Sequence, residues 1–369
     1  MKFISSVLFL LSFSLHLHSQ NFEIYISDAG NFNNPPWQIL KFDSAGTSPV
    51  SFINSHLNWP QDILFLEDSN VVLISNLGSD RISRYNAQTG AFINNFATAI
   101  SGPTRMKIGP DGLLYVLQWR GNGLVKRYQL DGSFVDDFTS VPVNQSIGLD
   151  WDDDKNLYVS SYNLDLVRKF DSTGADLGIF INSNLAGPTN IWFDDSGDLL
   201  VSDYDGGSLK RFDSSGTFLG VYISGLGNSE GFAFLPNGNL LLGNGATRSV
   251  KMYDSNGSFI KDIIPAATGS LLNPNAVVIR FKNDISTIEE VDLDLDLNFM
   301  YPSIGSLFKV EEKLISAAES VEIRDGIGRL IYHSKSLNWN AQSIANGNYI
   351  AILKMTNGQK FKQKIEVKN

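Results

Sequence analysis

The sequence contains no cysteine, and only four of its 369 residues are histidine. Without cysteine a disulfide framework is excluded, so the fold depends on a large apolar core, which a chain of this length can supply. His16 and His18 lie near the N-terminus, His333 lies near the C-terminus, and His56 precedes Trp59-Pro60. The sequence therefore lacks the residues for a Ser-His-Asp triad, a histidine-type zinc site or a histidine-based lyase.

Basic residues are also scarce, since 29 Lys and Arg stand against 39 Asp and Glu, which gives a formal net charge of −10. This balance argues against nucleic acid and against an anionic membrane surface as partners, because both attract basic proteins. Charged residues make up 18% and aromatic residues 11% of the chain. These fractions are typical of a globular β-rich protein and not of a disordered one.

Long apolar runs are missing except at the start of the chain. Lys2 precedes an apolar stretch from Phe3 to Leu17, and Ser19 and Gln20 offer a cleavage junction. The stretch is too short and too mixed for a spanning helix, so we interpret residues 1–20 as a secretory signal peptide. We expect no transmembrane segment and a secreted, extracellular or cell-surface location. Export without disulfides is typical of a bacterial protein.

Two short markers recur about every 42 residues, a period typical of blade arrays. One is an apolar residue followed by small or polar ones, as in Val201-Ser202-Asp203. Between the markers, each period divides into four short runs separated by Gly, Asn, Asp and Ser turns, which predicts four antiparallel strands, or one propeller blade. The other marker is an aromatic residue with a polar one, which we interpret as a turn cap: Phe42-Asp43, Tyr85-Asn86, Tyr128-Gln129, Phe170-Asp171, Phe212-Asp213 and Tyr253-Asp254.

The two ends of the array complement each other. Five complete sets of four runs begin near Gln61, Thr104, Ser146, Thr189 and Glu230. The N-terminal part adds three runs and residues 275–280 add one, so a sixth blade is shared between the ends and leaves no open edge. The prediction is an all-β fold with a six-bladed β-propeller over residues 21–282, closed by this shared N-/C-terminal blade.

The repeats resemble the six-bladed propellers of the NHL and SMP-30 (gluconolactonase)-like families. The resemblance rests on four segments of the array: Leu157–Ser161, Gly187–Ile191, Leu199–Asp203 and Arg211–Gly216. It implies a metal at the central channel, held by Glu, Asn and Asp side chains, and a lactonase activity.

A second domain follows a polar stretch that we interpret as a linker over residues 283–296. Residues 297–369 contain short strands with glycine turns, which predicts a small Ig-like β-sandwich. This tail resembles the C-terminal sorting domain, type A, of the bacterial type IX secretion system. That resemblance implies a Bacteroidota-type bacterium, export by the type IX machinery as partner, and removal of the tail; an Ig-like adhesion domain is the alternative. The matching residues are Tyr301-Pro302, Val321–Asp325, Gly328–Ile331, Ala345–Ile350 and the lysine-rich Lys360–Lys368.

The residue that enters the innermost strand of each blade is the candidate for chemistry, because these strands converge on the channel. Carried over from the SMP-30-like family, Asp62, Asn190 and Glu230 are candidate ligands of calcium or another divalent cation, and Glu230 is a candidate catalytic acid or base. Arg105 and Ile147 do not fit such a ligand set, and we favour a polar plug without metal, in which Arg105 pairs with Asp62 or Glu230. The candidates by register are Asp62, Arg105, Ile147, Asn190, Glu230 and Asn275.

Two further features have competing interpretations. The acidic residues Asp150, Asp152, Asp154 with Asn156 have a calcium-loop spacing, but a turn between strands is favoured because the glycine and terminal glutamate of such loops are missing. Aromatic residues fall throughout the array, and Trp119, Tyr162 and Tyr204 follow second strands, where side chains can reach the rim and could stack on a sugar or a peptide. Packing between blades is the favoured interpretation for the tryptophans Trp37, Trp59, Trp119, Trp151 and Trp192.

Two hypotheses on function follow. The first is a secreted or cell-surface propeller without enzymatic activity that binds a protein or glycan through its channel mouth and rim and is exported by the type IX system. The second is a divalent-metal-assisted lactonase or hydrolase of the SMP-30 kind that uses Glu230, Asn190 and Asp62. The first is favoured, because the repeats carry no clear catalytic set.

Overall fold

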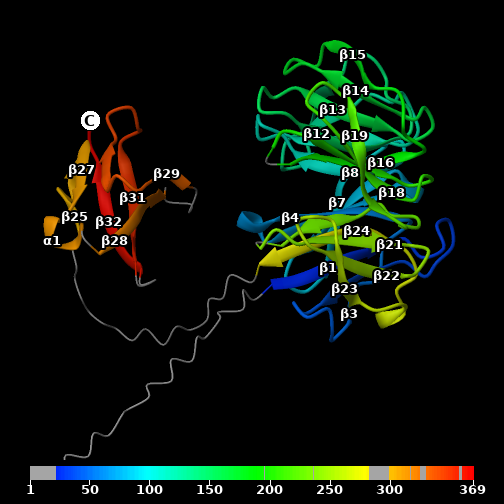
Figure 1. The fold of residues 1–369 in the computed structure, drawn as a ribbon, viewed down its shortest axis with the longest axis horizontal. Coiled ribbons are helices and arrows are strands. Elements are labelled where there is room, and N and C mark those ends of the chain that lie inside the picture. The colour runs from blue at the N-terminus through cyan, green and yellow to red at the C-terminus, as the bar shows by residue number, and fades with distance from the viewer. Residues whose placement is uncertain are drawn as a thin grey trace, which may run out of the picture. The chain divides into compact units, whose positions relative to one another are not determined.

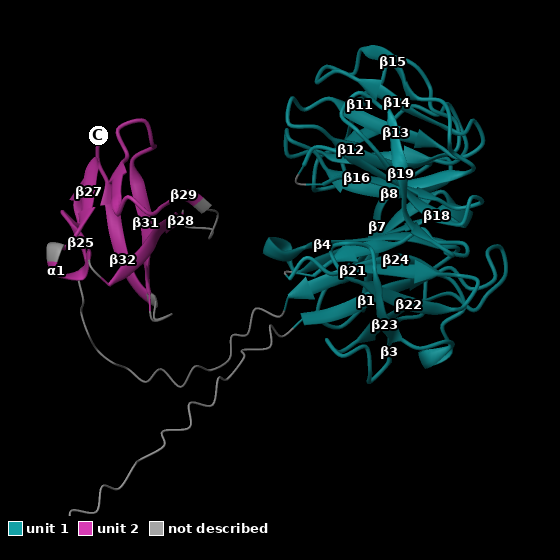
Figure 2. Cartoon of the chain, viewed as in Figure 1, with its two compact units in different colours: residues 1–284 teal, residues 285–369 magenta. Residues whose placement is uncertain are grey.

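The computed structural model describes residues 22–194, 196–235, 237–281, 299–315, 317–324, 330–356 and 360–369. The chain divides into two units, residues 1–284 and residues 285–369 (Figure 2). The predicted signal peptide, the predicted linker and Gly328-Arg329 of the tail motif lie outside the described residues. In the described part of the chain, no helix has the length and apolarity that a bilayer crossing requires.

Unit 1 is built from antiparallel sheets of four strands, which we call blades 1 to 6 (Figure 1). Blade 1 is β24 (Pro274–Phe281), β1 (Phe22–Asp28), β2 (Gln38–Phe42) and β3 (Val50–Ile53); blade 2 is β4 (Pro60–Leu66), β5 (Val71–Asn76), β6 (Arg81–Asn86) and β7 (Phe92–Thr98); blade 3 is β8 (Pro103–Ile108), β9 (Leu114–Gln118), β10 (Lys126–Tyr128) and β11 (Phe134–Asp137); blade 4 is β12 (Ser146–Trp151), β13 (Leu157–Ser161), β14 (Leu166–Phe170) and β15 (Asp176–Ile181); blade 5 is β16 (Pro188–Phe193), β17 (Leu199–Asp203), β18 (Ser208–Phe212) and β19 (Phe218–Ser224); blade 6 is β20 (Phe232–Phe234), β21 (Leu240–Asn244), β22 (Ser249–Tyr253) and β23 (Phe259–Ile264).

Burial within a blade falls from the second strand to the last. Every residue of β5, β9, β13, β17 and β21 is buried, whereas the fourth strands alternate or are mostly exposed. A continuous Val/Ile/Leu run in the second strand is what a strand covered on both faces requires. Five of the six predicted turn caps are confirmed after the third strands, where side-chain oxygens accept backbone N–H bonds at Asp43, Asn86, Asp171, Asp213 and Asp254. At Gln129 backbone hydrogen bonds close the turn instead.

Hydroxyl groups join successive blades near the channel. At one position of the second strand, a serine donates a hydrogen bond to a backbone carbonyl of the next blade. In blade 3 this position is Leu117, and Thr104 donates to the carbonyl of Ser146 instead, over 2.7 Å. In blade 6 it is Gly243, where a Cβ would lie only 2.5 Å from the carbonyl oxygen of Pro274, so a side chain is excluded. The serine bonds run from Ser27 to Pro60 (2.9 Å), Ser75 to Thr104 (2.6 Å), Ser160 to Thr189 (2.6 Å) and Ser202 to Ser229 (2.8 Å).

Blade 1 contains strands from both ends of the unit. β24 is the first strand of this sheet and pairs antiparallel with β1, from Phe22 opposite Phe281 to Asp28 opposite Pro274. On its other side β24 contacts β4 and β20, the first strands of blades 2 and 6. Residues 22–28 and 274–281 therefore lie in one four-stranded sheet.

Unit 2 has two sheets around one core. β25 (Met300–Tyr301), β27 (Leu307–Val310) and β30 (Asn338–Asn340) form one sheet; β26 (Ile304–Gly305), β32 (Lys360–Val367), β31 (Gly347–Met355), β28 (Ala318–Arg324) and β29 (Leu330–Ser334) form the other. Phe299, Phe308 and Trp339 pack with Val321 and Leu353 between the sheets. A short helix, α1 (Glu312–Ile315), connects β27 to β28.

Candidate functional site

The first strands of the blades present two rings of residues to the channel. Strand pairing places Ile63, Met106, Leu149, Ile191, Phe232 and Val277 in equivalent positions, opposite one marker residue of each second strand. The residues two positions before these six form one set, which we call the outer ring. The residues one position before them form a second set, which we call the inner ring. The outer ring is Gln61, Thr104, Ile147, Thr189, Glu230 and Asn275; the inner ring is Asp62, Arg105, Gly148, Asn190, Gly231 and Ala276.

The predicted common register of the six channel candidates is therefore wrong. Ile147, Glu230 and Asn275 belong to the outer ring, whereas Asp62, Arg105 and Asn190 belong to the inner one. The pairing shifts just before these positions, for example between Pro103 and Met106, so residues cannot be aligned across blades by counting from the strand start. Such a bulge re-aims neighbouring side chains, which is why both rings face the channel.

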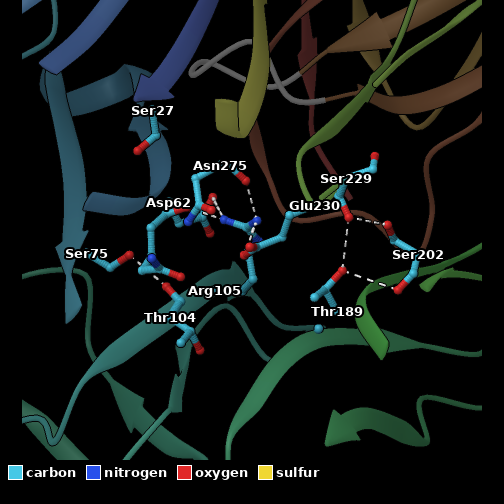
Figure 3. Close-up of polar contacts among 12 residues, drawn as sticks. Ser27, Asp62, Ser75, Thr104, Arg105, Thr189, Ser202, Ser229, Glu230 and Asn275 are labelled. Carbon is cyan, nitrogen blue, oxygen red and sulfur yellow. Dashed lines mark hydrogen bonds and ion pairs between the residues drawn. The ribbon is translucent and has the colours of Figure 1, made fainter. Parts of the chain in front are cut away.

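Arg105 lies across the channel between the rings (Figure 3). Its Nη2 donates to Oε1 of Glu230 over 2.8 Å and to the carbonyl of Asn275 over 2.5 Å, and its Nη1 donates to the carbonyl of Gln61. Nη1 also lies 3.8 Å from Oδ1 of Asp62. The guanidinium thus joins β8 to β4 and β24 and to the start of β20. The predicted pairing of Arg105 with Asp62 or Glu230 is present with both carboxylates.

Burial sets the electrostatics of this cluster. The pKa of Glu230 is raised to about 7. Loss of water is the main cause and nearby Asp62 adds to it, whereas Arg105 acts in the opposite direction. Burial likewise raises the pKa of Asp62, offset by Arg105 and by hydrogen bonds from the backbone N–H groups of Met106 and Ile63. The cluster holds two carboxyl groups against one guanidinium, so part of the acidic charge depends on pH.

A divalent cation does not fit this arrangement. Glu230 lines the cavity at the channel mouth, whereas Asp62 and Asn190 line a second cavity of 270 Å³ on the other side of Arg105. The guanidinium already pairs with both carboxylates that a hard cation would need, and it cannot lose its proton. Among the described residues, no group of three or more His, Cys, Asp or Glu side chains gathers as a metal site would require.

The mouth cavity has a volume of 290 Å³, close to the lower end of the roughly 300–1,000 Å³ range of ligand pockets. Its wall comes from the residue directly after the second strand of each blade, which we call the wall position. Leu77, Trp119, Tyr162 and Tyr204 occupy it in blades 2 to 5 and line the cavity. The rings of Trp119 and Tyr162 lie 5.5 Å apart, and those of Tyr162 and Tyr204 lie 6.1 Å apart. The wall is therefore a continuous aromatic arc over three blades.

Trp59 extends the wall at a conformational cost. Its carbonyl accepts a hydrogen bond from the amide of Leu77, and the equivalent residues in blades 3 and 5 are Gly102 and Gly187. All three have a positive φ, which for Trp59 is 51°. A side chain in this left-handed region costs roughly 1–2 kcal/mol, which glycine avoids. Gln145 and Asn228 hold the equivalent place in blades 4 and 6, also with a positive φ, so this position accepts residues other than glycine. The ring of Trp59 lines the cavity and meets Phe32 at 5.6 Å.

The floor of the cavity is polar. Asn275, with 3% of its surface exposed, lines the cavity, and its side-chain Nδ2 is buried without a hydrogen-bond partner in the described part of the chain. In the same part of the chain, Oε2 of Glu230 has no hydrogen-bond donor, and Gln61 lines the floor beside it. The Nδ2 atom of Asn275 lies beneath the accessible surface, so of this pair the group that the floor offers to a ligand is the carboxyl oxygen of Glu230, which favours a ligand that donates a hydrogen bond.

The other predicted features are structural. Trp151 packs edge-on against Tyr115 at 5.0 Å, and Trp192 stacks on Phe232 at 3.7 Å, which is the predicted packing between blades. Trp59 and Trp119 also contact a ring of a neighbouring blade, Phe32 and Tyr162, but in addition they line the mouth cavity. In the acidic loop, Oδ1 of Asp152 accepts the backbone N–H of Asn156 over 2.8 Å, which is the turn that the sequence favoured.

Four residues that line the cavity escape the sequence reasoning, namely Phe32, Gln61, Leu77 and Thr189. Phe32 comes from a loop between β1 and β2 that has no counterpart in the other blades, so no repeat signal marks it. Leu77 was not singled out, although alignment with Trp119, Tyr162 and Tyr204 after the second strands is sufficient to find it.

Solved structures share the arrangement of unit 1. A chain of a nidogen–laminin complex matches with a TM-score of 0.56 and 16% identity, over 70% of this chain and 98% of that chain. A protein of unknown function from Bacteroides caccae matches with a TM-score of 0.54 and 15% identity, over 70% and 98% of the two chains. The fold is a β-propeller. These identities show the fold alone.

A candidate gluconolactonase matches the propeller less well, with a TM-score of 0.48 and 16% identity over 56% of this chain and 78% of that chain. No protein-family model matches the sequence, and no curated protein matches it either. The function of this propeller must therefore be argued from its own residues.

Glu230 is expected to make the stability of the propeller fall as the pH rises from about 4.5 to 7. Its pKa is about 7 in the folded protein and near 4.5 when unfolded, so in this window the folded state holds a proton that the unfolded state has lost. The resulting decrease in the free energy of unfolding approaches about 3 kcal/mol above pH 7. Urea unfolding at several pH values, with Glu230→Gln as comparison, measures it.

The difference between the two proteins is the informative quantity, because other carboxyl groups contribute equally to both curves. Glu230→Gln is expected to remove the decline between pH 4.5 and 7. Parallel curves for the two proteins over that window would show that the Glu230 carboxyl is not held protonated by burial.

Proposed function

We propose that this chain is a secreted propeller without enzymatic activity that binds a glycan in its channel mouth. The observation that carries the proposal is the aromatic wall of Trp59, Trp119, Tyr162 and Tyr204 above a polar floor with Gln61 and Glu230. Sugar rings have apolar faces that stack on aromatic side chains, and their hydroxyls both donate and accept hydrogen bonds. A hydroxyl at the floor can donate to the carboxylate of Glu230.

A glycan fits this cavity better than a protein side chain of either charge. An anionic group would meet the carboxyls of Glu230 and, beyond Arg105, Asp62. A cationic group would meet the guanidinium of Arg105, which already pairs with Glu230 over 2.8 Å. A neutral hydroxyl-bearing ring meets neither repulsion, and the largely aromatic wall favours it over water.

Glycan arrays test this proposal. The purified protein is expected to bind a restricted set of glycans, and Trp119→Ala and Trp59→Gly are expected to weaken binding at least about fivefold, since a stacked ring contributes on the order of 1 kcal/mol or more. Trp59→Gly is informative because glycine suits the positive φ, so the melting temperature should not fall. Phe259→Ala, at an exposed ring on the outer strand of blade 6, is the matched control.

The wall variants count as evidence for recognition only if their melting temperatures show that they are folded. Retention of glycan binding in both wall variants, or binding of a protein partner with no glycan on the array, would contradict the proposal directly. Either result favours a protein ligand on the rim.

A lactonase or hydrolase is the second candidate. The observation in its favour is the pKa of Glu230, which lies near neutral and suits a general acid or base. The divalent metal that the SMP-30-like resemblance implies is not supported, because Arg105 stands between Glu230 and Asp62. Release of acid from sugar lactones by the purified protein, lost in Glu230→Gln, would establish this function in place of simple binding.

The tail acts, on this proposal, as an Ig-like sorting domain for type IX export, and the signal peptide directs the first export step. The two sheets of unit 2 around a common core support a separately folded domain at residues 297–369. Fused to an unrelated periplasmic protein in a host with this system, the tail is expected to send the fusion outside the cell. Retention of the fusion in the periplasm, with the tail intact, would contradict the assignment.

A further inference from the structure

The polar floor of the mouth cavity borders an apolar part of the same ring. Gln61, Asn275 and Glu230, the outer-ring residues of blades 2, 1 and 6, form the polar floor and line the cavity. These blades are neighbours, because β24 of blade 1 contacts both β4 and β20. The outer-ring residues of blades 4 and 5, Ile147 and Thr189, line the same cavity, and we call them the apolar border. A ligand in the mouth therefore meets two surfaces of different character.

The polar floor has side-chain atoms that are free to bind a ligand. Gln61 is only 3% exposed, yet in the described part of the chain neither Oε1 nor Nε2 of its amide has a hydrogen-bond partner. Both atoms reach the cavity, unlike the enclosed Nδ2 of Asn275. Among the described residues, Oδ1 of Asn275 and Oε2 of Glu230 also accept no hydrogen bond. The polar floor therefore offers one amide donor and three acceptor oxygens, although buried groups of this kind normally have partners.

The apolar border offers a ligand mainly carbon atoms. Ile147 is 5% exposed and lines the cavity. The hydroxyl of Thr189 is used within the fold, because it donates to the carbonyl of Ser202 over 3.2 Å and lies 3.5 Å from the carbonyl of Ser229 (Figure 3). Its hydrogen is therefore not available to a ligand. A ligand hydroxyl placed against this border would lose water without gaining a donor, which is unfavourable.

An acetamido group matches this division between the two surfaces. Its carbonyl oxygen accepts a hydrogen bond, its N–H donates one in the opposite direction, and its methyl group is apolar. The carbonyl can accept from Nε2 of Gln61, and the N–H can donate to Oε2 of Glu230 or Oδ1 of Asn275. The methyl group can pack on Ile147. A sugar hydroxyl can bind the same polar atoms, but it brings no apolar atom to the border.

The polar partners of such a group are held in place within the protein itself. Nη1 of Arg105 donates to the backbone carbonyl of Gln61, and Nη2 donates to Oε1 of Glu230 and to the backbone carbonyl of Asn275. One buried guanidinium thus fixes the three floor residues relative to one another. Groups that are ordered before binding lose little conformational freedom, which increases the affinity for a ligand that fits them.

We propose that the sugar unit bound in the mouth is an N-acetylhexosamine, with its acetamido group between the polar floor and the apolar border. This inference rests on the proposed glycan function and adds the chemical class of the bound unit. The sugar ring stacks on the aromatic wall, and the acetamido group distinguishes this class from plain hexoses.

The ligand test uses the full chain and matched methyl glycosides of glucose, galactose and mannose, titrated by tryptophan fluorescence. In each series the hydroxyl next to the anomeric carbon is kept, or replaced by an N-formyl or an N-acetyl amino group. The N-acetyl sugar of at least one series is expected to bind at least about tenfold more tightly than its hydroxyl parent. The N-formyl sugar keeps the hydrogen bonds but lacks the methyl group, so it is expected to bind roughly fourfold less tightly than the N-acetyl sugar.

A variant of Gln61 tests the same inference from the side of the protein. Gln61→Met removes the amide with little change in shape, and it is expected to lower the tenfold affinity ratio of N-acetyl to hydroxyl sugar to about threefold or less. Gln88→Met, at an exposed glutamine of the same blade, is the matched control and is expected to keep the ratio. The melting temperature of each variant verifies folding, and the ligand series on the unmodified protein decides if Gln61→Met does not fold.

Equal affinity for hydroxyl and N-acetyl sugars in all three series, or an unchanged ratio in a folded Gln61→Met protein, overturns the inference while leaving a glycan-binding mouth. Equal affinity for N-formyl and N-acetyl sugars overturns the placement of the methyl group on the apolar border. Failure of every sugar overturns the proposed function itself.

Discussion

Replacing Arg105 by alanine is expected to lower the free energy of unfolding by about 3–5 kcal/mol, the cost of removing one partner of a buried ion pair. The guanidinium is 5% exposed and neutralises Glu230 at 2.8 Å and Asp62 at 3.8 Å. Without it two carboxyl groups remain buried near each other, and the carbonyls of Gln61 and Asn275 lose their donors. Chemical denaturation at pH 7.5 measures the loss.

Two comparisons make this result specific. Arg120→Ala removes an exposed ion pair with Asp80 and is expected to cost no more than about 1 kcal/mol. The variant Asp62→Asn, Arg105→Met, Glu230→Gln removes all three charges and is expected to regain most of the stability. Millimolar calcium is expected to stabilise Arg105→Ala but not the parent protein, because only the variant leaves the two carboxylates unneutralised. A loss below about 1 kcal/mol in Arg105→Ala would show that the plug is not required.

Deletion of residues 21–54 is expected to abolish cooperative unfolding of the propeller. The deletion removes β1, β2 and β3, which leaves β24 without the partner that it pairs with over its length. The first strand of blade 1 would then expose both an unpaired edge and the apolar residues that β1 and β2 cover, including Val277. Calorimetry and circular dichroism on heating measure the transition.

Deletion of residues 297–369 is the matched control, because it removes a unit with its own core. The propeller in that protein is expected to melt as sharply as in the full chain. A sharp transition near the original temperature in the 21–54 deletion would contradict the dependence of the propeller on its N-terminal strands.

The sequence was sufficient to predict the blades but not the position of each channel residue. Regular turn chemistry, such as the capped turns at Asp171 and Asp213, marks the strands because it depends on neighbouring residues. The alignment of channel residues across the blades depends on where the pairing of the first and second strands shifts. The slip ahead of Met106 and Leu149 has no sequence signature, so Arg105 and Glu230 were assigned to one ring although they lie in two.

The aromatic residues illustrate a second limit. Trp151 and Trp59 are both large apolar residues near a first strand, yet one packs between blades and the other lines the mouth. The distinction lies in backbone conformation and in the Phe32 loop, which come from contacts distant in sequence. The sequence does indicate Trp119, Tyr162 and Tyr204, because their repeated place after the second strand gives them one common direction.

The pairing of β1 with β24 has a consequence for how the chain becomes folded as it is made. Residues 22–28 are synthesised long before residues 274–281, and their sheet cannot be completed until the later segment arrives. Contacts between such distant segments form late, because a long loop must close before they contribute. Strands β1, β2 and β3 therefore keep the edge of β1 unpaired while the other blades assemble. A chain that passes end-first through a membrane pore would keep its first blade unfinished until nearly the whole propeller had emerged.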